Sequence, residues 1–156
     1  MKTIGLLGGM SWESTDLYYQ QINKMVQMKL GKLHSAKVVL ISVDFAEIEE
    51  LQHKGFWDEA GLYLKDKAIQ LEKGGADGIV LCTNTMHKVA SYIENSTTIP
   101  FIHIADATAT EILSQNIKKI GLLGTAFTME QDFYKSRLED KGLEVITPNK
   151  ANRKIV

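Results

Sequence analysis

The segment GIVLCTNT (78–85) decides the fold class of this chain. It opens with four uncharged residues that include the β-branched pair Ile79-Val80, a pattern typical of a strand buried on both faces of a sheet. The polar run Thr83-Asn84-Thr85 then ends the strand and offers side-chain caps for a following helix. Buried strands followed at once by helices are typical of parallel sheets in α/β proteins.

Outward from this segment, short apolar strands alternate with amphipathic helical stretches. Ser11 is the predicted N-cap of the first helix, with Glu13 in its first turn and Gly31 as its stop. This alternation predicts an α/β fold with a parallel sheet and right-handed crossovers. The predicted strands are 4–7, 37–43, 78–82, 99–104, 119–124 and 143–147, and the predicted helices are 11–31, 44–51, 57–74, 86–93, 105–113 and 128–142.

The pentapeptide IGLLG occurs twice, at 4–8 and at 120–124. Any strand–turn–helix unit of an α/β protein can look like this, so two unrelated units stay an alternative. Interpreted as a duplication, the repeat predicts a first lobe over 1–117 and the start of a second lobe over 118–156. Two strands alone do not form a stable sheet layer, so we expect the second lobe to pack against the first lobe or against another chain.

The composition limits the kinds of partner and the cellular compartment that we expect. The 156 residues carry a formal charge of -1, which gives no reason to expect nucleic acid or a membrane surface. No set of His, Cys, Asp and Glu has metal-ligand spacing. The first apolar run is broken by Gly8-Gly9, so no signal peptide is expected, and the single cysteine fits the reducing cytoplasm.

Cys82 is the predicted catalytic residue. It ends a strand, at the edge where open parallel sheets bind ligands, and it precedes a predicted helix N-terminus that favours the thiolate. Thr83, Asn84 and Thr85 would supply donors for a carboxylate. The alternative is a buried cysteine that acts as a small apolar residue beside ordinary helix caps. A sulfur sealed in the core and facing away from any opening would end the case for a catalytic Cys82.

Other candidates surround this edge of the sheet. The turn Gly8-Gly9-Met10-Ser11 would let the backbone approach a ligand, although it lacks the pattern of a phosphate loop. Thr125 holds the corresponding place after the repeated strand and is a further candidate anion contact. His87 is expected on a helix surface, although it could pair with Cys82, and His103 is expected to be a core residue of a strand.

Five segments resemble the bacterial aspartate/glutamate racemase family, and most closely its broad-specificity amino-acid racemases: GLLGGMSWES (5–14), LHSAKVVLISVDF (33–45), GIVLCTNTMHKVA (78–90), FIHIADAT (101–108) and IGLLGT with FTMEQDFY (120–134). The resemblance implies two pseudo-symmetric α/β lobes with an amino acid between them, no pyridoxal phosphate, no metal, and a homodimer. It implies that Cys82 is the first-lobe cysteine. It also implies that Thr83, Asn84, Thr85 and Thr125 hold the substrate carboxylate, and that Met10 and Gln52 lie near the substrate.

The sequence departs from the family in one respect. The family's second cysteine lies in a Gly-Cys-Thr motif beyond position 156, and a lysine associated with acidic side chains also lies downstream, whereas Cys82 is the single cysteine here. One thiol reaches one face of the α-carbon, and general acid–base help is worth about 10²–10⁴-fold. We therefore expect this chain by itself to have little racemase activity. The alternatives are a non-catalytic amino-acid-binding or vestigial domain, a cysteine hydrolase using Cys82 and His87, and a flavodoxin-like phosphate-binding module.

Overall fold

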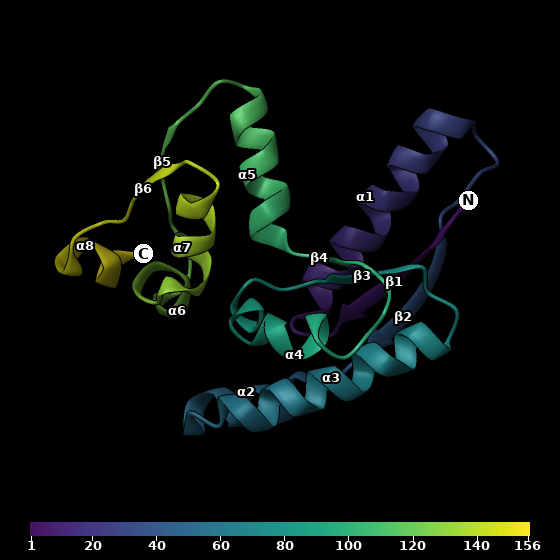
Figure 1. The fold of residues 1–156 in the computed structure, drawn as a ribbon, viewed down its shortest axis with the longest axis horizontal. Helices are drawn as coiled ribbons and strands as arrows, with labels where there is room; N and C mark the ends of the chain where they lie inside the picture. The colour runs from purple at the N-terminus through teal and green to yellow at the C-terminus, as the bar shows by residue number, and fades with distance from the viewer. The chain divides into compact units, whose positions relative to one another are not determined.

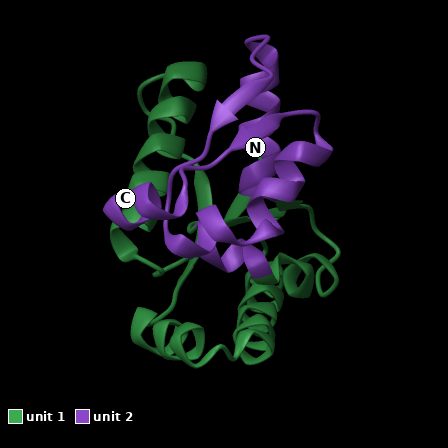
Figure 2. Cartoon of the chain, turned by 90° about the vertical axis from the view of Figure 1, so that its left-hand side faces the viewer, with its two compact units in different colours: residues 1–83, 89–102 green, residues 84–88, 103–156 purple.

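The computed structural model describes residues 1–156, which form two compact units. Unit 1 consists of residues 1–83 and 89–102, and unit 2 of residues 84–88 and 103–156 (Figure 2). The chain therefore enters unit 2 briefly at 84–88, returns to unit 1, and enters unit 2 again at 103. The lobe boundary predicted between residues 117 and 118 rests on the repeated pentapeptide and is a different division from these units. It stays a prediction.

Unit 1 is built around a four-stranded parallel sheet of order β2-β1-β3-β4, which confirms the predicted α/β fold class (Figure 1). Helices alternate with strands as the sequence pattern predicts, with two helices between the second and third strands of the chain. The elements are β1 (Thr3–Gly8), α1 (Trp12–Leu30), β2 (Lys37–Ser42), α2 (Phe45–Lys54), α3 (Trp57–Lys73), β3 (Gly78–Leu81), α4 (Ala90–Glu94) and β4 (Phe101–Ile102).

The central strand β1 separates the two helical layers of unit 1. A Cβ on Gly5 would lie 2.9 Å from Cβ of Ala76, just after α3, whereas a Cβ on Gly8 would lie 2.3 Å from a methyl of Thr15 in α1. Since Gly5 and Gly8 point to opposite faces, α1 and α3 cover opposite sides of the sheet. The α3 side is closed by a fully buried row of residues four and three apart, namely Ala60, Leu64, Ala68 and Leu71.

Helix α1 begins and ends as predicted. The Ser11 hydroxyl accepts a hydrogen bond from the Ser14 N–H at 3.4 Å, and Gly31, with φ of 112°, ends the helix. Its helical spacing does not produce a buried face, however. Thr15 is its one buried residue, whereas Leu17 and Met25 are 58% and 62% exposed.

Unit 2 has a core of its own. The elements are α5 (Ile104–Ser114), β5 (Lys119–Gly121), α6 (Ala126–Glu130), α7 (Asp132–Asp140), β6 (Glu144–Ile146) and α8 (Lys150–Ile155). Strands β5 and β6 pair in parallel. One face of this pair is buried in a cluster of Ala105, Ala109, Leu122, Tyr134, Leu138, Leu143 and Val145. Its other face is open, since Leu123 is 64% and Ile146 50% exposed.

Four predicted elements differ clearly from the structure. The strand expected over 119–124 ends at Gly121, as β5. The strand expected over 99–104 shrinks to β4, because His103 already has an extended N-cap backbone and begins α5. The helix expected from Thr128 is two helices, since Gln131, with ψ of 149°, interrupts it and Thr125 is the true first N-cap. The helix expected over 86–93 begins as a 3₁₀ turn, Thr85–Val89, before α4. No helix combines the length and the apolar character needed to cross a membrane.

Candidate active site

Cys82 lies directly after β3 in unit 1, at the carboxyl end of the sheet. Its backbone N–H donates to the Leu7 carbonyl at 2.9 Å, and its own carbonyl accepts a hydrogen bond from the Ser14 hydroxyl at 3.0 Å. Strand β1 and helix α1 therefore fix the backbone of this residue from two sides. This position is the one that the sequence predicts for it.

The state of the thiol is not the predicted one. The Cys82 side chain is 0% exposed, and its sulfur lies 3.9 Å from the Val80 carbonyl. Burial raises the pKa of the Cys82 thiol to about 12, so the expectation of a favoured thiolate is wrong for this structure. The helix expected to stabilise a thiolate is a five-residue 3₁₀ turn that begins only at Thr85, and such a short turn has little dipole to offer.

The glycine turn after β1 approaches its own chain closely. Gly9 has φ of 92°, and a Cβ there would lie 2.2 Å from the Val43 carbonyl oxygen. The Gly9 N–H donates to the Thr15 hydroxyl at 2.9 Å. The close approach of the Val43 backbone accounts for a glycine at position 9. The expected approach of this turn to a ligand stays a prediction. Met10, the next residue, is buried, and Gln52 is half-buried on α2, so the proposed closeness of these two residues to a substrate stays a prediction.

A hollow of about 460 Å³ lies within unit 2 and brings two of the predicted site residues together. Asn84 and Thr125, 41 positions apart in the sequence, both line it. Thr83 is half-buried in unit 1, and Thr85 is half-buried at the start of the 3₁₀ turn. The remaining lining residues are Ile104, Leu122, Leu123, Gly124, Thr128 and Tyr134.

Thr128 and Tyr134 are lining residues that the sequence analysis does not single out. The Thr125 hydroxyl accepts a hydrogen bond from the Thr128 N–H at 3.3 Å, and the two hydroxyl oxygens lie 3.2 Å apart. The Tyr134 hydroxyl donates to the Thr108 hydroxyl at 3.4 Å. Gly124 packs against the Thr128 side chain and Gly8 against Thr15, but the repeat aligns Thr128 with Trp12, so the repeated pentapeptide gives no signal for Thr128.

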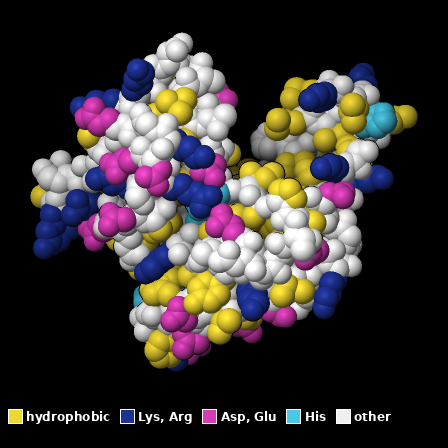
Figure 3. All heavy atoms as spheres, viewed as in Figure 1, with side chains coloured by type: hydrophobic (Ala, Val, Ile, Leu, Met, Phe, Trp, Pro, Cys, Tyr) yellow, Lys and Arg dark blue, Asp and Glu magenta, His cyan; other side chains and the backbone are white.

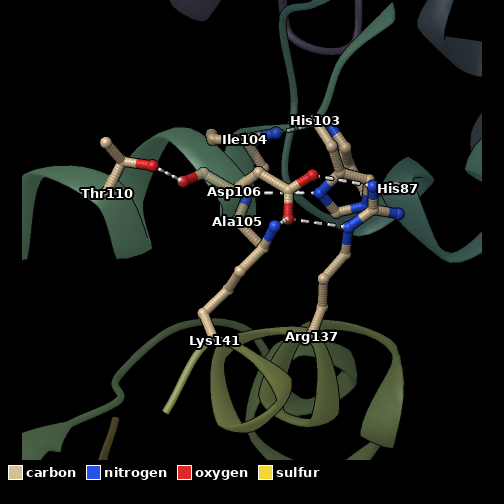
Figure 4. Close-up of polar contacts among 8 residues, drawn as sticks. All are labelled: His87, His103, Ile104, Ala105, Asp106, Thr110, Arg137 and Lys141. Carbon is tan, nitrogen blue, oxygen red and sulfur yellow. Dashed lines mark hydrogen bonds and ion pairs between the residues drawn. The ribbon is translucent and has the colours of Figure 1, made fainter. Parts of the chain in front are cut away.

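Two buried histidines hold the start of α5 in unit 2 (Figure 4). His103 Nδ1 accepts a hydrogen bond from the Ala105 N–H, and His87 Nε2 accepts one from the Ile104 N–H, both at 3.2 Å. Their rings meet edge to face with centroids 4.4 Å apart. His103 is a buried, hydrogen-bonded residue as expected, although it is a helix cap and not part of a strand. The expectation that His87 lies on a helix surface is wrong, because its ring is needed to satisfy this helix end.

An ion-pair cluster lies beside these rings. Arg137 reaches the Asp106 carboxylate through Nε at 3.0 Å and Nη2 at 2.8 Å, and Lys141 Nζ lies 3.6 Å from it. The hydrogen bond from Arg137 lowers the pKa of Asp106. Burial, helped by the charge of Arg137, lowers the pKa of His103 to about 4. His103 is therefore a neutral cap at ordinary pH. No group of three or more His, Cys, Asp and Glu side chains is placed to hold a metal ion.

The profile of the Asp/Glu/hydantoin racemases matches residues 7–156. The chain belongs to this family. Among curated relatives, the chain is 30% identical over 148 residues to a broad-specificity amino-acid racemase of Bacillus subtilis, an alignment that spans 92% of the chain and 63% of that protein. The chain thus spans less than two thirds of the length of this relative.

Solved structures agree with the family. Over its whole length the chain is 58% identical to a crystal structure from Yersinia pestis that carries an Asp/Glu racemase designation, with a TM-score of 0.96 and 68% of that chain covered. An aspartate racemase homologue from Pyrococcus horikoshii is 36% identical, with a TM-score of 0.89, 99% of this chain covered and 68% of the other. These similarities confirm the family resemblance stated from the sequence.

Proposed function

We propose that this chain acts on the α-carbon of an amino acid of the aspartate/glutamate type through the thiol of Cys82, without pyridoxal phosphate. The observation that carries the proposal is the family match together with the position of Cys82 after β3. A thiol at that edge of a parallel sheet is where a ligand is expected. The lone cysteine also supports the cytoplasm as the proposed compartment, and the family resemblance supports a homodimer.

The hollow of unit 2 is the proposed site for the substrate carboxylate. Besides Tyr134, whose hydroxyl donates to Thr108, it is lined by three residues whose side chains can donate hydrogen bonds to an anion, namely Asn84, Thr125 and Thr128. The pairing of the two threonine hydroxyls at 3.2 Å fixes their positions before a ligand arrives. Such preorganised donors hold a carboxylate without a large cost in side-chain entropy.

The buried thiol limits what Cys82 can do at rest. A protonated thiol with a pKa of about 12 is not a base, so proton abstraction requires an opening that exposes the sulfur. A substrate ammonium group beside the sulfur would then favour the thiolate, because an opposite charge close by lowers the pKa of a thiol. We propose that this activation occurs only with the substrate bound.

One thiol can remove and return a proton on a single face of the α-carbon. Racemisation needs a second acid on the other face, and the sequence holds one cysteine. We therefore propose that the 156-residue chain by itself exchanges the α-proton with solvent and inverts the centre slowly or not at all. A non-catalytic amino-acid-binding domain is the second candidate, and the complete burial of the Cys82 sulfur is the observation that favours it.

Deuterium exchange separates these two candidates. L- and D-aspartate and L- and D-glutamate are incubated with the chain in heavy water, and loss of the α-proton signal is followed by NMR while chirality is followed by chiral chromatography. Exchange that disappears in the Cys82→Ser variant supports Cys82 chemistry. Ligand binding that is weakened by Thr125→Val, without any exchange, supports the binding domain. If neither exchange nor binding is observed, both candidates are contradicted.

A further inference from the structure

His87 lies in residues 84–88, the short stretch with which the chain first enters unit 2. Its imidazole is buried, and Nε2 accepts a hydrogen bond from the Ile104 N–H at 3.2 Å (Figure 4). The backbone N–H of His87 donates to the Asn84 carbonyl at 3.1 Å, within the same stretch. His87 therefore connects the residues around Asn84 to the first turn of α5.

This connection joins two residues that line the same hollow. Asn84 and Ile104 both line the hollow of unit 2, although 20 positions separate them in the sequence. The other lining residues lie between 122 and 134, so Asn84 is the one lining residue that comes from before α5. The position of the Asn84 side chain in the hollow therefore depends on how residues 84–88 are held against α5.

The contact between His87 and Ile104 has a chemical requirement. A backbone N–H can only donate, so Nε2 of His87 carries no proton, and the proton of the neutral ring is on Nδ1. In the space-filling view, acidic and basic side chains share the visible surface of α5 and α7, whereas very little histidine surface is seen there (Figure 3). Because the His87 ring is shielded from water, removing its acceptor would leave the Ile104 N–H without that partner.

We propose that His87 is a positioning residue of the carboxylate site, because its Nε2 holds residues 84–88 against α5 and thereby keeps the Asn84 side chain in the hollow. The inference rests on the proposed function for the identity of the ligand, whereas the placement of Asn84 can be measured without a ligand. His87 is not itself a lining residue of the hollow. If His87 served only to stabilise the start of α5, its loss would lower the stability of unit 2 without acting through Asn84.

NMR tests the placement of Asn84 without a ligand. His87→Gln keeps an acceptor near the position of Nε2, His87→Leu has a similar volume and no acceptor, and His87→Asn is a polar variant whose amide is too short to reach Ile104. In His87→Leu and His87→Asn we expect the Ile104 amide to exchange about tenfold faster relative to core amides of unit 2, and the side-chain amide signals of Asn84 to shift. His87→Gln should keep both near their wild-type values. Unchanged Asn84 signals in folded His87→Leu or His87→Asn would overturn the proposal.

A double-mutant cycle on ligand binding tests whether His87 acts through Asn84. In calorimetric titrations with L-aspartate and L-glutamate, His87→Leu and Asn84→Ala should each raise the dissociation constant about tenfold, because a donor to the carboxylate is lost or displaced. The double variant should bind no more weakly than either single variant. Effects that multiply to about a hundredfold, or His87→Gln binding as weakly as His87→Leu, would overturn the proposal.

Leu143→Ala is the control for general destabilisation. Leu143 is buried in the core of unit 2, next to the amino end of β6, whereas the hollow is lined by residues that follow β5. Its truncation should lower the stability of unit 2 and leave binding unchanged. If the wild-type chain binds neither amino acid, the proposed function fails, and the Asn84 signals still decide the role of His87.

Discussion

Arg137 donates a hydrogen bond to each carboxylate oxygen of Asp106, from Nε at 3.0 Å and from Nη2 at 2.8 Å. This fork ties α7 to the first turn of α5, and each side chain is about one third exposed. We expect Arg137→Lys to lower the free energy of unfolding by about 1 kcal/mol, because a lysine cannot form the two-pronged contact. Urea titration measures the change. An unchanged free energy of unfolding would show that the ion pair does not stabilise the fold.

His103 makes stability depend on pH. Its pKa falls from 6.5 in the unfolded chain to about 4 in the folded one, so between these values the unfolded chain binds the extra proton. Stability should therefore decrease as the pH is lowered from about 6.5 to about 4, by about 1.4 kcal/mol per pH unit at most. The total is on the order of 3 kcal/mol.

The matched variant for this prediction is His103→Asn. Asparagine can still accept the Ala105 N–H as an N-cap but does not titrate, so the acid-induced loss above pH 4 should shrink. His103→Ala should lose the cap and cost about 1 kcal/mol at neutral pH. If the His103→Asn variant lost stability on acidification as steeply as the wild-type chain, another group would be responsible.

The thiol of Cys82 should resist labelling in the folded chain. A rise of its pKa from 9.0 to about 12 lowers the thiolate fraction about 10³-fold, and burial blocks the reagent as well. We expect iodoacetamide to modify the chain very slowly at pH 8 and rapidly once concentrated urea is added. Mass spectrometry of the intact chain follows the reaction. Stoichiometric labelling within minutes, with the circular dichroism of the folded chain unchanged, would contradict the buried position.

Gly9 and Gly75 form a matched pair for the glycine turn. Both have positive φ, 92° and 90°, but a Cβ on Gly9 would meet the Val43 backbone at 2.2 Å whereas a Cβ on Gly75 meets nothing within 4 Å. Gly75→Ala should cost about 1 kcal/mol from backbone strain alone. Gly9→Ala should cost several kcal/mol, because backbone atoms must move. Equal losses in urea denaturation would show that the turn relaxes freely.

Local patterns in the sequence predict most of the fold. The apolar run 78–82 and the repeat at 4–8 identify central parallel strands, and Ser11 identifies a helix start, because these signals are contained within a few residues. The end of β4 is missed because histidine is not among the preferred N-cap residues, so His103 does not mark a helix start as Ser11 does. The break at Gln131 is missed for the same kind of reason, since nothing in FTMEQDFY marks it as a change of direction.

The candidate site is predicted less completely. Cys82 and its place after a strand follow from sequence position. Asn84 and Thr125 line one hollow, and their contact with a substrate carboxylate stays a prediction. Burial of the sulfur and the raised pKa depend on how β1, α1 and β3 pack together, which no local pattern encodes. His87 is misplaced because its role depends on the backbone of Ile104, 17 residues away.

Because unit 2 has a core of its own, one free energy of unfolding does not describe the whole chain. Units 1 and 2 each bury their own apolar residues, so heat or urea can melt one cooperative block before the other. Substitutions at Gly9 report on the block built from the four-stranded sheet, whereas those at Arg137 and His103 report on the other. Hydrogen exchange should accordingly resolve two classes of slowly exchanging amides, each with its own opening free energy.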